Sequence, residues 1–525
     1  MRSICFYFQV HQPYRLRTYR FFDIGERHDY FDEINNAFIL KRVAEKCYLP
    51  ANETIYNLIK KFGGRFKASY SISGTAMDQF EKFAPEVLDS FKKLASTGHV
   101  EFLAETYSHS LSSLKSKDEF FKQVDLQKKQ IKKFFGQEPK TFRNTELIYS
   151  DGIGEMVAEM GFDTMLTEGA KHVLGWKSPN FLYCNAINPK LKMLLKNFSL
   201  SDDIAFRFSQ RSWQDWPLTA EKFAGWLNQI DSKQEIINLF MDYETFGEHQ
   251  WPETGIFDFL KAMPEKVFEM TDFGFTTPSE ASEKLQVVSA IHVPYPISWA
   301  DEERDLTAWL GNELQDEAFD KLYQIEEKVK YCSDPQIQKD WHYLQTSDHF
   351  YYMCTKWFSD GDVHKYFNPY GTPYEAFINY MNVLSDFIIR VDKCYDPVKA
   401  RVGALKEQGT QIASRVKSSA KKHTDQSLKR MRSKLEELKE GEAGFEEIAK
   451  LSNTRLKEAL RKINTRDLVI ALKNSSKELR EKVYGNLGKR AQKNFDEFER
   501  KFRDVKKTDV KKQREKIMRQ IRKIF

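Results

Sequence analysis

Stretches of β-favouring residues alternate with amphipathic stretches over the first 285 or so residues of the chain. Ile4–Val10, Phe66–Ile72, Val100–Leu103 and Ile236–Met241 are short apolar runs rich in β-branched and aromatic residues. Such runs, bounded by Gly, Pro or charged residues, predict buried strands. Between them, apolar residues in Asp118–Phe135 keep helical spacing. Strand-helix alternation over this length predicts an α/β fold with a parallel sheet or barrel.

The spacing of apolar residues becomes purely helical from about residue 301 to residue 393. One stripe is formed by Leu306, Leu310, Leu314, Phe319 and Leu322. A stripe of this kind predicts a helical domain that packs on the barrel.

Beyond Pro397, apolar residues step by three, four and seven as far as Leu438, with a polar gap between Ser418 and Ser427. This pattern predicts a helical stalk of coiled-coil type, too interrupted to fix an oligomeric state. A Gly-containing break at 440–444 then precedes a compact helical unit that reaches Phe525.

Charge and composition divide the chain at about residue 400. The net charge is +6, but residues 401–525 hold 36 Lys and Arg against 18 Asp and Glu, whereas residues 1–400 are acidic. Only 6 of the aromatic residues, and no proline, follow residue 400. An aromatic-rich body with a large core is therefore expected to precede a basic, helix-favouring tail.

Cysteine usage and the N-terminal segment favour a soluble, cytoplasmic protein. The six cysteines lie far apart, with no CxxC pair, which excludes a disulfide scaffold and a zinc ribbon and fits a reducing compartment. The apolar run Ile4–Val10 is too short to span a membrane, and no small-residue cleavage site follows it.

Four polar clusters lie where strands are expected to end. Three of them, His11-Gln12-Pro13, Glu105–His109 and Asp242–Trp251, follow runs named above, and Arg143–Glu146 follows Lys140-Thr141-Phe142. Taken singly, each has an ordinary structural explanation, such as a buried histidine satisfied by backbone or a solvated loop. Functional groups of a parallel barrel gather at the carboxyl ends of its strands, so these clusters would share one rim. Several carboxylates and imidazoles beside apolar strands are expensive to bury, which favours a functional site.

The motifs of residues 1 to about 395 resemble glycoside hydrolase family 57, a family of retaining α-glucan enzymes. The resemblance rests on His11-Gln12-Pro13, Gly98–His109, Asn144-Thr145-Glu146, Asp242–Gly247, and Ser298–Asp301 with Trp309–Asn312. Leu200–Asp203 and Thr346–Tyr352 resemble the α-amylase branch. The resemblance implies an incomplete (β/α)7 barrel followed by an all-α domain. We therefore expect a barrel over 1–285, a helical domain over 286–396, a stalk over 397–440 and a small all-α domain over 441–525.

By position, the resemblance implies that Glu146 is the nucleophile and Asp242 the general acid/base of a double-displacement reaction on α-1,4-glucosidic bonds. A retaining glycosidase needs two carboxyls roughly 5–5.5 Å apart, one ionised and one protonated. Arg143 and Asn144 precede Glu146 and are a cation and an amide that could keep it ionised. Asp242 follows an apolar run, so burial is expected to raise its pKa.

Further residues of these motifs are expected to bind substrate. His11 and His109 would donate hydrogen bonds to sugar hydroxyls, and the tryptophans would stack on sugar faces, although core packing explains each tryptophan equally well. No metal or cofactor is expected. The expected substrate-binding residues are His11, Gln12, His109, Arg143, Glu244, His249, Trp251, Trp299, Asp301 and Trp309.

The segment Phe445–Phe525 resembles the C-terminal domain of the flagellar motor switch protein FliG. The resemblance runs through Phe445–Leu451, Leu460–Ile463, Ala471-Leu472-Lys473 and Glu478–Lys482. It implies a helical interaction module with a protein partner or self-association through 397–525. A nucleic-acid or acidic-polymer binder is the alternative, disfavoured by the few aromatics, and a solvated bundle without a partner remains open.

Three alternatives to α-amylase activity also remain. One is a 4-α-glucanotransferase of the same family. The second is a metal-dependent deacetylase or mannosidase using His11, His109 and His249, although these histidines lack close ligand spacing. The third is a non-catalytic carbohydrate-binding scaffold, which the presence of both carboxylates disfavours.

Overall fold

The computed structural model describes residues 2–356, 368–397, 400, 445–502 and 504–522. It divides into two compact units, Met1–Ala400 and Arg401–Phe525. Most of the predicted stalk over 397–440 lies outside the described residues, so that prediction is not tested.

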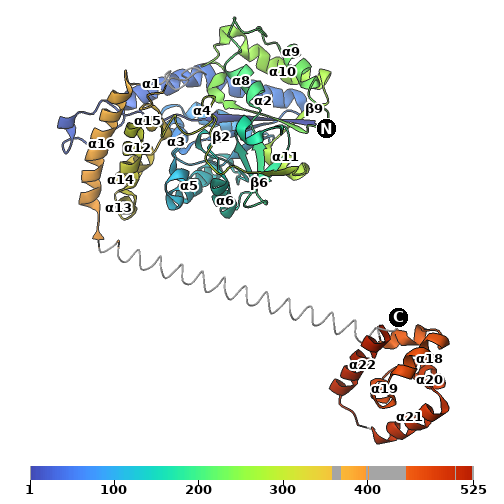
Figure 1. Ribbon diagram of the computed structural model, residues 1–525. Coiled ribbons are helices and arrows are strands. Elements are labelled where there is room, and N and C mark those ends of the chain that lie inside the picture. Colours follow the sequence, from blue (N-terminus) through green and yellow to red (C-terminus); the bar gives the residue numbers. More distant parts are fainter. Residues whose placement is uncertain (1, 357–367, 398–399, 401–444, 503, 523–525) are drawn as a thin grey trace. The chain divides into compact units, whose positions relative to one another are not determined.

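The described part of the first unit contains ten strands, and Figure 1 shows how the sheet and its helices are arranged. The strands are β1 (Arg2–Val10), β2 (Ala68–Ile72), β3 (Val100–Leu103), β4 (Thr141–Arg143), β5 (Thr164–Thr167), β6 (Tyr183–Asn185), β7 (Lys192–Leu195), β8 (Ile236–Asp242), β9 (Phe273–Thr276) and β10 (Ser289–Ile291). All four strands expected from apolar runs are present, and only the second starts two residues later than its run.

The strands form a curled, largely parallel sheet. One path runs β3-β2-β1-β8, with β9 also pairing with β1, and the other runs β10-β6-β7-β5-β4. A parallel bridge between Ala104 and Phe142 joins β3 to β4. Between β7 and β8, the backbone N–H of Asn197, just beyond the end of β7, donates to the carbonyl of Asn238 in β8 at 2.9 Å. The α/β prediction with a parallel sheet is therefore confirmed.

Residues 2–285 are described throughout, and they contain eleven α-helices interspersed with the strands. The helices are α1 (Glu33–Val43), α2 (Leu49–Phe62), α3 (Gly74–Phe83), α4 (Pro85–Ala95), α5 (Lys117–Phe135), α6 (Asp151–Glu159), α7 (Lys171–Leu174), α8 (Phe198–Ala205), α9 (Ala220–Asn228), α10 (Ile256–Met270) and α11 (Pro278–Lys284). The helix expected over 118–135 is α5, which begins at a Ser116 cap and ends at Gly136 with φ +68°. Glycine favours this left-handed C-cap because it has no Cβ.

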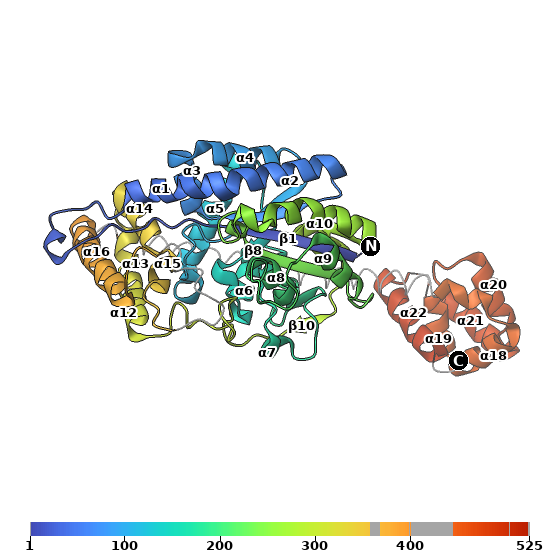
Figure 2. The same cartoon turned by 90° about the horizontal axis from the view of Figure 1, so that it is seen from above.

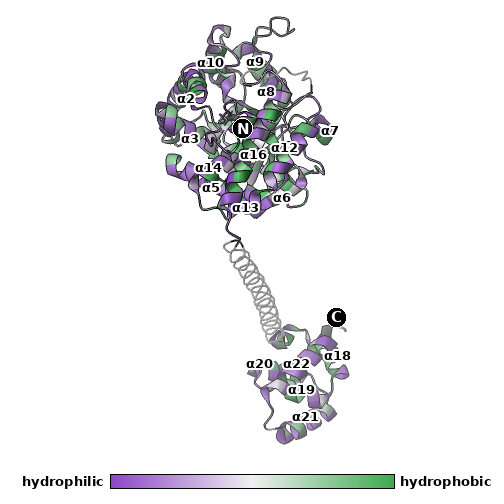
Figure 3. Cartoon of the chain, turned by 90° about the vertical axis from the view of Figure 1, so that its left-hand side faces the viewer, coloured by the Kyte–Doolittle hydropathy of each residue, from purple (hydrophilic) through white to green (hydrophobic). Residues whose placement is uncertain are grey.

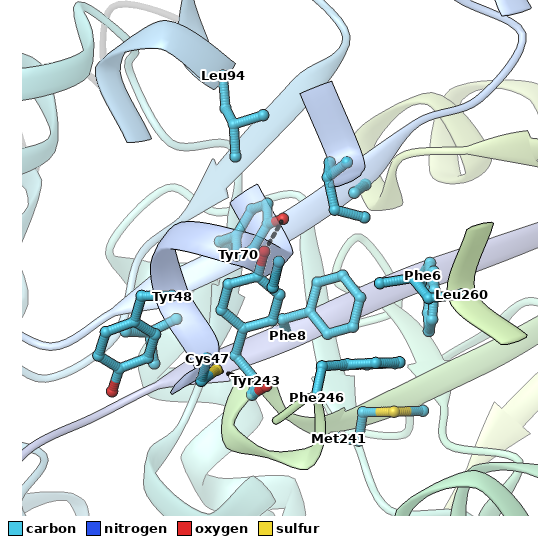
Figure 4. Packing of buried hydrophobic residues seen from close by; sticks show 14 of the residues in the cluster. Phe6, Phe8, Cys47, Tyr48, Tyr70, Leu94, Met241, Tyr243, Phe246 and Leu260 are labelled. Carbon is cyan, nitrogen blue, oxygen red and sulfur yellow. Dashed lines mark hydrogen bonds between the residues drawn. The ribbon is translucent and has the colours of Figure 1, made fainter. Parts of the chain in front are cut away.

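Side chains of β1 alternate between two buried layers. Phe6 and Phe8 face the helices and pack with Tyr70, Tyr243 and Phe246, as Figure 4 shows. The intervening residues Cys5 and Tyr7 belong to a separate cluster with Leu103, Leu166, Leu194 and Phe240. A strand buried on both faces reads as a continuous apolar run, which explains the sequence of Ile4–Val10.

A second group of helices lies at the end of the sheet toward which β1 runs (Figures 1 and 2). It comprises α12 (Glu313–Tyr323), α13 (Glu326–Lys330), α14 (Pro335–Leu344), α15 (Ser347–Tyr351) and α16 (Pro373–Cys394). This placement sets helical residues over the carboxyl ends of the strands.

The prediction that the chain is helical from residue 301 is wrong over residues 301–312. Leu306 and Leu310 lie in turns, and the first helix starts only at Glu313. Asp301 and Arg304 adopt positive φ angles of 51° and 53°, which an α-helix excludes. The Asp305 carboxylate also accepts from the backbone N–H of Thr307 at 2.9 Å, a local bond that competes with helix formation.

The second unit is all-helical in its described part. It contains η8 (Glu447–Lys450), α18 (Asn453–Lys462), α19 (Thr465–Ala471), α20 (Lys477–Gly485), α21 (Lys489–Lys501) and α22 (Lys507–Arg522). Its core joins Phe445, Leu456, Leu479, Phe495 and Ile517. Figure 3 shows hydrophilic and hydrophobic residues side by side on these helices. None of the described helices of the chain is long and apolar enough to cross a membrane.

Candidate active site

One pocket opens at the carboxyl ends of the strands. Each of the four polar clusters at the predicted rim contributes at least one residue to its lining. Its walls come from the ends of β1 and β8, from the loops after β3 and β4, and from the segments around Trp299 and Asp348. The lining residues are Gln9, His11, Gln12, Pro13, Arg15, His109, Glu146, Asp242, Glu244, His249, Trp299 and Asp348.

Glu146 lies in η4 (Thr145–Leu147), directly after β4, in a left-handed conformation with φ 55° and ψ 27°. The residue is buried, with 3% of its surface exposed. The indole Nε1 of Trp299 donates to Oε2 at 2.7 Å, and the Ser347 hydroxyl donates to Oε1 at 3.4 Å. A left-handed non-glycine residue costs about 1–3 kcal/mol and is typical of functional sites. The fold thus holds this carboxylate in one orientation among several donors.

His109 bridges two carboxylates. Its Nδ1 lies 3.0 Å from Glu105 Oε2 and its Nε2 lies 3.3 Å from Glu146 Oε1. Burial alone would lower the pKa of His109, but the hydrogen bonds to Glu105 and Glu146 outweigh it and raise the pKa to about 9. The ring is therefore a cation at neutral pH, and both nitrogens donate.

His11 stacks on His109, with ring centroids 4.0 Å apart and planes inclined by 17°. Its Nδ1 lies 2.7 Å from the Ser73 hydroxyl and its Nε2 lies 3.0 Å from Asp348 Oδ2. Burial and the positive charge of His109 lower the pKa of His11. At neutral pH a neutral His11 ring thus lies against a charged His109 ring, so the two histidines differ in charge although they are stacked in one pocket.

Glu244 occupies the same pocket two residues beyond Asp242, the last residue of β8. The Tyr48 hydroxyl donates to Glu244, and Gln12 Nε2 donates to its Oε1 at 3.4 Å. Burial, and next the negative charge of Asp242, raise the pKa of Glu244 to about 8. Glu244 is therefore protonated at neutral pH.

Four of the expected substrate-binding residues do not line the pocket. Arg143 is fully buried, with its guanidinium carbon 4.8 Å from the Trp299 ring centroid, and Trp309 is 1% exposed within the core. Trp309 thus follows the core-packing alternative. Trp251 is 55% exposed, and Asp301 pairs with Lys356 at 3.0 Å. Substrate contacts by Arg143, Trp251 and Asp301 stay predictions.

Several pocket groups were not assigned to the site from the sequence. Asp348, Ser347 and Arg15 come from the helical group or from a loop, where no strand end marks them. Glu105 was visible as a charged residue directly after a buried strand, yet its role in holding His109 depends on a left-handed turn at His109 with φ 51°.

No group of three or more His, Cys, Asp or Glu residues in the described part of the chain has an arrangement that could hold a metal ion. The histidines His11 and His109 turn their nitrogens toward Ser73, Asp348, Glu105 and Glu146 instead.

Comparison with known families finds two matches along the chain. Residues 5–294 match the model of glycosyl hydrolase family 57, and residues 426–525 match that of the FliG C-terminal domain. The chain is 44% identical over 400 residues to the "Putative alpha-amylase" of Methanocaldococcus jannaschii, covering 73% of this chain and 84% of that protein. It is 38% identical over 80 residues to the flagellar motor switch protein FliG of Thermotoga maritima, of which it spans 24%.

Two solved structures share the fold. A family 57 branching enzyme from Thermococcus kodakaraensis superposes with a TM-score of 0.51 at 14% identity, covering 67% of this chain and 86% of that one. An α-amylase from Thermotoga maritima superposes with a TM-score of 0.50 at 16% identity, covering 77% of this chain and 96% of that one.

Proposed function

The chain belongs to glycosyl hydrolase family 57, and on that premise we propose that it is a retaining α-amylase-type enzyme that cleaves α-1,4-glucosidic bonds. The observation that carries the proposal is the pocket in which Glu146 is held by His109, Trp299 and Ser347 and which Asp242 also lines. A pair of carboxyls that act on one anomeric carbon must share one pocket.

In the first step, Asp242 protonates the glycosidic oxygen while a carboxylate oxygen of Glu146 bonds to the anomeric carbon. The bond between that carbon and the leaving sugar breaks, and a glycosyl ester of Glu146 remains. In the second step, Asp242 accepts a proton from water as the water oxygen bonds to the anomeric carbon and Glu146 departs. If a sugar hydroxyl replaces water, the same chemistry becomes that of a 4-α-glucanotransferase.

The donors around Glu146 suit both steps. The His109 cation and the Trp299 N–H keep the carboxylate ionised before attack and stabilise the charge that returns to it on departure. Glu244, protonated at neutral pH, adds no negative charge beside Asp242. His11, Gln12 and His249 line the pocket and are proposed to bind sugar hydroxyls.

The domain plan proposed for the chain follows the sequence. An incomplete (β/α)7 barrel over 1–285 and a helical domain over 286–396 form the catalytic unit. A stalk of coiled-coil type over 397–440 connects it to a FliG-like interaction module over 441–525, which binds a protein partner or a second copy.

The decisive experiment compares Glu146→Gln and Asp242→Asn with wild type on maltooligosaccharides, with product analysis. Both variants should stay folded and lose at least about 10²–10⁴-fold in rate, because each removes a group that acts in the transition state. Glu155→Gln, an exposed carboxyl on α6, is the matched control. Near wild-type turnover by either site variant contradicts the proposal.

Azide provides a finer test of the nucleophile. A Glu146→Gly variant leaves room for azide on the face that Glu146 occupied, so a product of inverted configuration is expected. Products from glycogen and from short maltooligosaccharides further separate hydrolysis from transfer, since transfer lengthens some chains.

A further inference from the structure

Charged residues lie at or just beyond the carboxyl ends of five strands, and their signs alternate around the sheet. In the order β3, β4, β5, β7 and β8 these are Glu105, Arg143, Glu168, Lys196 and Asp242. Four of them lie two residues beyond Leu103, Leu166, Leu194 and Phe240, which fill the interior of the curled sheet. Because side chains two apart on a strand share a face, these charges continue the interior layer toward the pocket.

Lys196 is the cation on β7 in this series, and it is buried with 4% exposure. Its ammonium donates to Asp202 Oδ1 at 3.0 Å and lies 3.8 Å from Glu168 Oε2. It also lies 5.3 Å from the centroid of the Trp299 ring. A buried ammonium with these partners is held in one place.

Trp299 connects this cation to the nucleophile position. Its indole N–H donates to Glu146, while Arg304 donates to its backbone carbonyl and reaches Asp202 at 3.5 Å. Asp202 therefore joins Lys196 to Arg304, which holds the backbone of the same tryptophan. Lys196 shares the neighbourhood of the ring with Arg143, whose guanidinium carbon lies 4.8 Å from the ring centroid. Within the described residues, Lys196 does not line the pocket, whereas Trp299, whose ring it approaches, does.

We propose that Lys196 is a positioning residue for the glycosidase reaction, acting through Trp299 on the Glu146 carboxylate. This inference rests on the proposed function and adds a group that touches neither substrate nor reacting atoms. A cation near an indole ring is attracted to its π electrons and withdraws electron density, which makes the N–H a stronger donor. The stronger donor stabilises Glu146 as a carboxylate, its state before attack and after departure.

The first test compares Lys196→Met with Lys196→Arg and Lys192→Met. Lys192 lies on the same strand and donates to the Ser282 carbonyl, so it serves as a matched control. In Lys196→Met the acidic limb of kcat/KM should move to higher pH by roughly half a unit to one unit, since the carboxylate loses stabilisation. Lys196→Arg, which keeps the charge, should restore the wild-type limb, and Lys192→Met should leave it in place.

A kinetic readout separates the two chemical steps. On an aryl α-maltoside with a good leaving group, the second step limits the rate, so Lys196→Met should lower kcat by about tenfold while KM falls with it. A uniform loss with an unmoved acidic limb would mean that Lys196 serves only folding, and would overturn the proposal.

Trp299→Phe keeps an aromatic ring and removes the N–H, so it tests the route even if Lys196→Met fails to fold. It should shift the acidic limb in the same direction, and an unmoved limb overturns the proposal. Adding Lys196→Met or Lys196→Gln to Trp299→Phe should cause no further shift, whereas an additive shift shows a direct effect. Failure of the proposed function would appear separately, as activity in Glu146→Gln.

Discussion

His109 is the residue whose protonation most directly affects the candidate nucleophile. The folded protein raises the pKa of His109 from 6.5 to about 9, so the folded state holds this proton more tightly than the unfolded state. Stability from His109 is therefore complete below pH 6.5 and is lost as pH rises through 9.

His109→Asn should thus destabilise most at low pH. Relative to wild type, the loss in free energy of unfolding should shrink by about 3 kcal/mol between pH 6.5 and pH values above 9. Urea unfolding across this range measures it. His172→Asn, at an exposed position, should show no such trend, and a difference that stays constant with pH for His109→Asn contradicts a charged His109.

Glu244 also keeps its proton at neutral pH, but the protonated carboxyl is neutral whereas protonated His109 is a cation. The pKa of Glu244 rises from 4.5 to about 8, so its contribution to stability is present below pH 4.5 and is lost as pH rises through 8. Glu244→Gln mimics the protonated form. The variant should match wild type near pH 4.5 and exceed it by an amount on the order of 5 kcal/mol above pH 8.

Thermal unfolding at several pH values tests this expectation. Glu253→Gln, an exposed carboxyl in the loop that follows β8, is the control and should track wild type throughout. A Glu244→Gln protein that loses stability at every pH would mean that Glu244 is ionised and paired in the folded state.

Individual residues also mark the limit of sequence-based prediction. Glu146, Asp242 and His109 line one pocket, as expected of residues at or after the carboxyl ends of parallel strands. Asp348 and Ser347 belong to the Thr346–Tyr352 motif, but they reach the site through the packing of the helical group, which no strand end marks in the sequence. Lys196 follows β7, whose sequence Lys-Met-Leu-Leu holds no β-branched or aromatic residue that would mark a strand.

At the scale of elements, β8 is continued by η5 (Tyr243–Thr245) and a tight turn at Gly247. Gly247 has φ +107°, and a Cβ there would lie 1.9 Å from the carbonyl oxygen of Lys46. Lys46 belongs to η2 (Ala44–Tyr48), a π-helical turn that carries Tyr48 to Glu244. The close backbone approach therefore links the turn after β8 to a donor of the pocket.

Gly247→Ala should push η2 away and weaken the contact between Tyr48 and Glu244. Gly255 is the matched control, because it has φ +85° but nothing within 4 Å of its Cβ position. Gly255→Ala should cost about 1 kcal/mol from backbone strain alone, and Gly247→Ala clearly more. Chemical denaturation measures both, and equal losses would show that the backbone of η2 moves freely.

The helical group illustrates a different failure of pattern at this scale. The spacing of Leu306 and Leu310 is helical, yet left-handed Asp301 and Arg304 and the Asp305 side chain divert the chain into turns. This segment carries Trp299 and Arg304 to Glu146 and Asp202. A helix over this segment would be incompatible with these contacts. The contacts at the site therefore determine the local structure here, although the apolar spacing favours a helix.

At the scale of the whole molecule, the two units have separate cores. The clusters of the first unit end at Val391, and that of the second lies between Phe445 and Ile521. The change in charge and aromatic content at residue 400 predicted this division, because a basic tail poor in aromatics cannot share the core of the body.

A chain that ends after Asp396 should therefore fold and hydrolyse short maltooligosaccharides as the full chain does, because every pocket residue lies before residue 349. It should lose the self-association or partner binding proposed for residues 397–525, observed as a shift to monomer in sizing with light scattering.

A chain that ends after Ser385 is the control, since it deletes buried Asp386, Phe387 and Val391 of α16 and should unfold. Loss of hydrolysis by the first truncation contradicts an independent catalytic unit. A full-length chain that is already monomeric and binds neither protein nor anionic polymer contradicts the interaction module and leaves a solvated bundle.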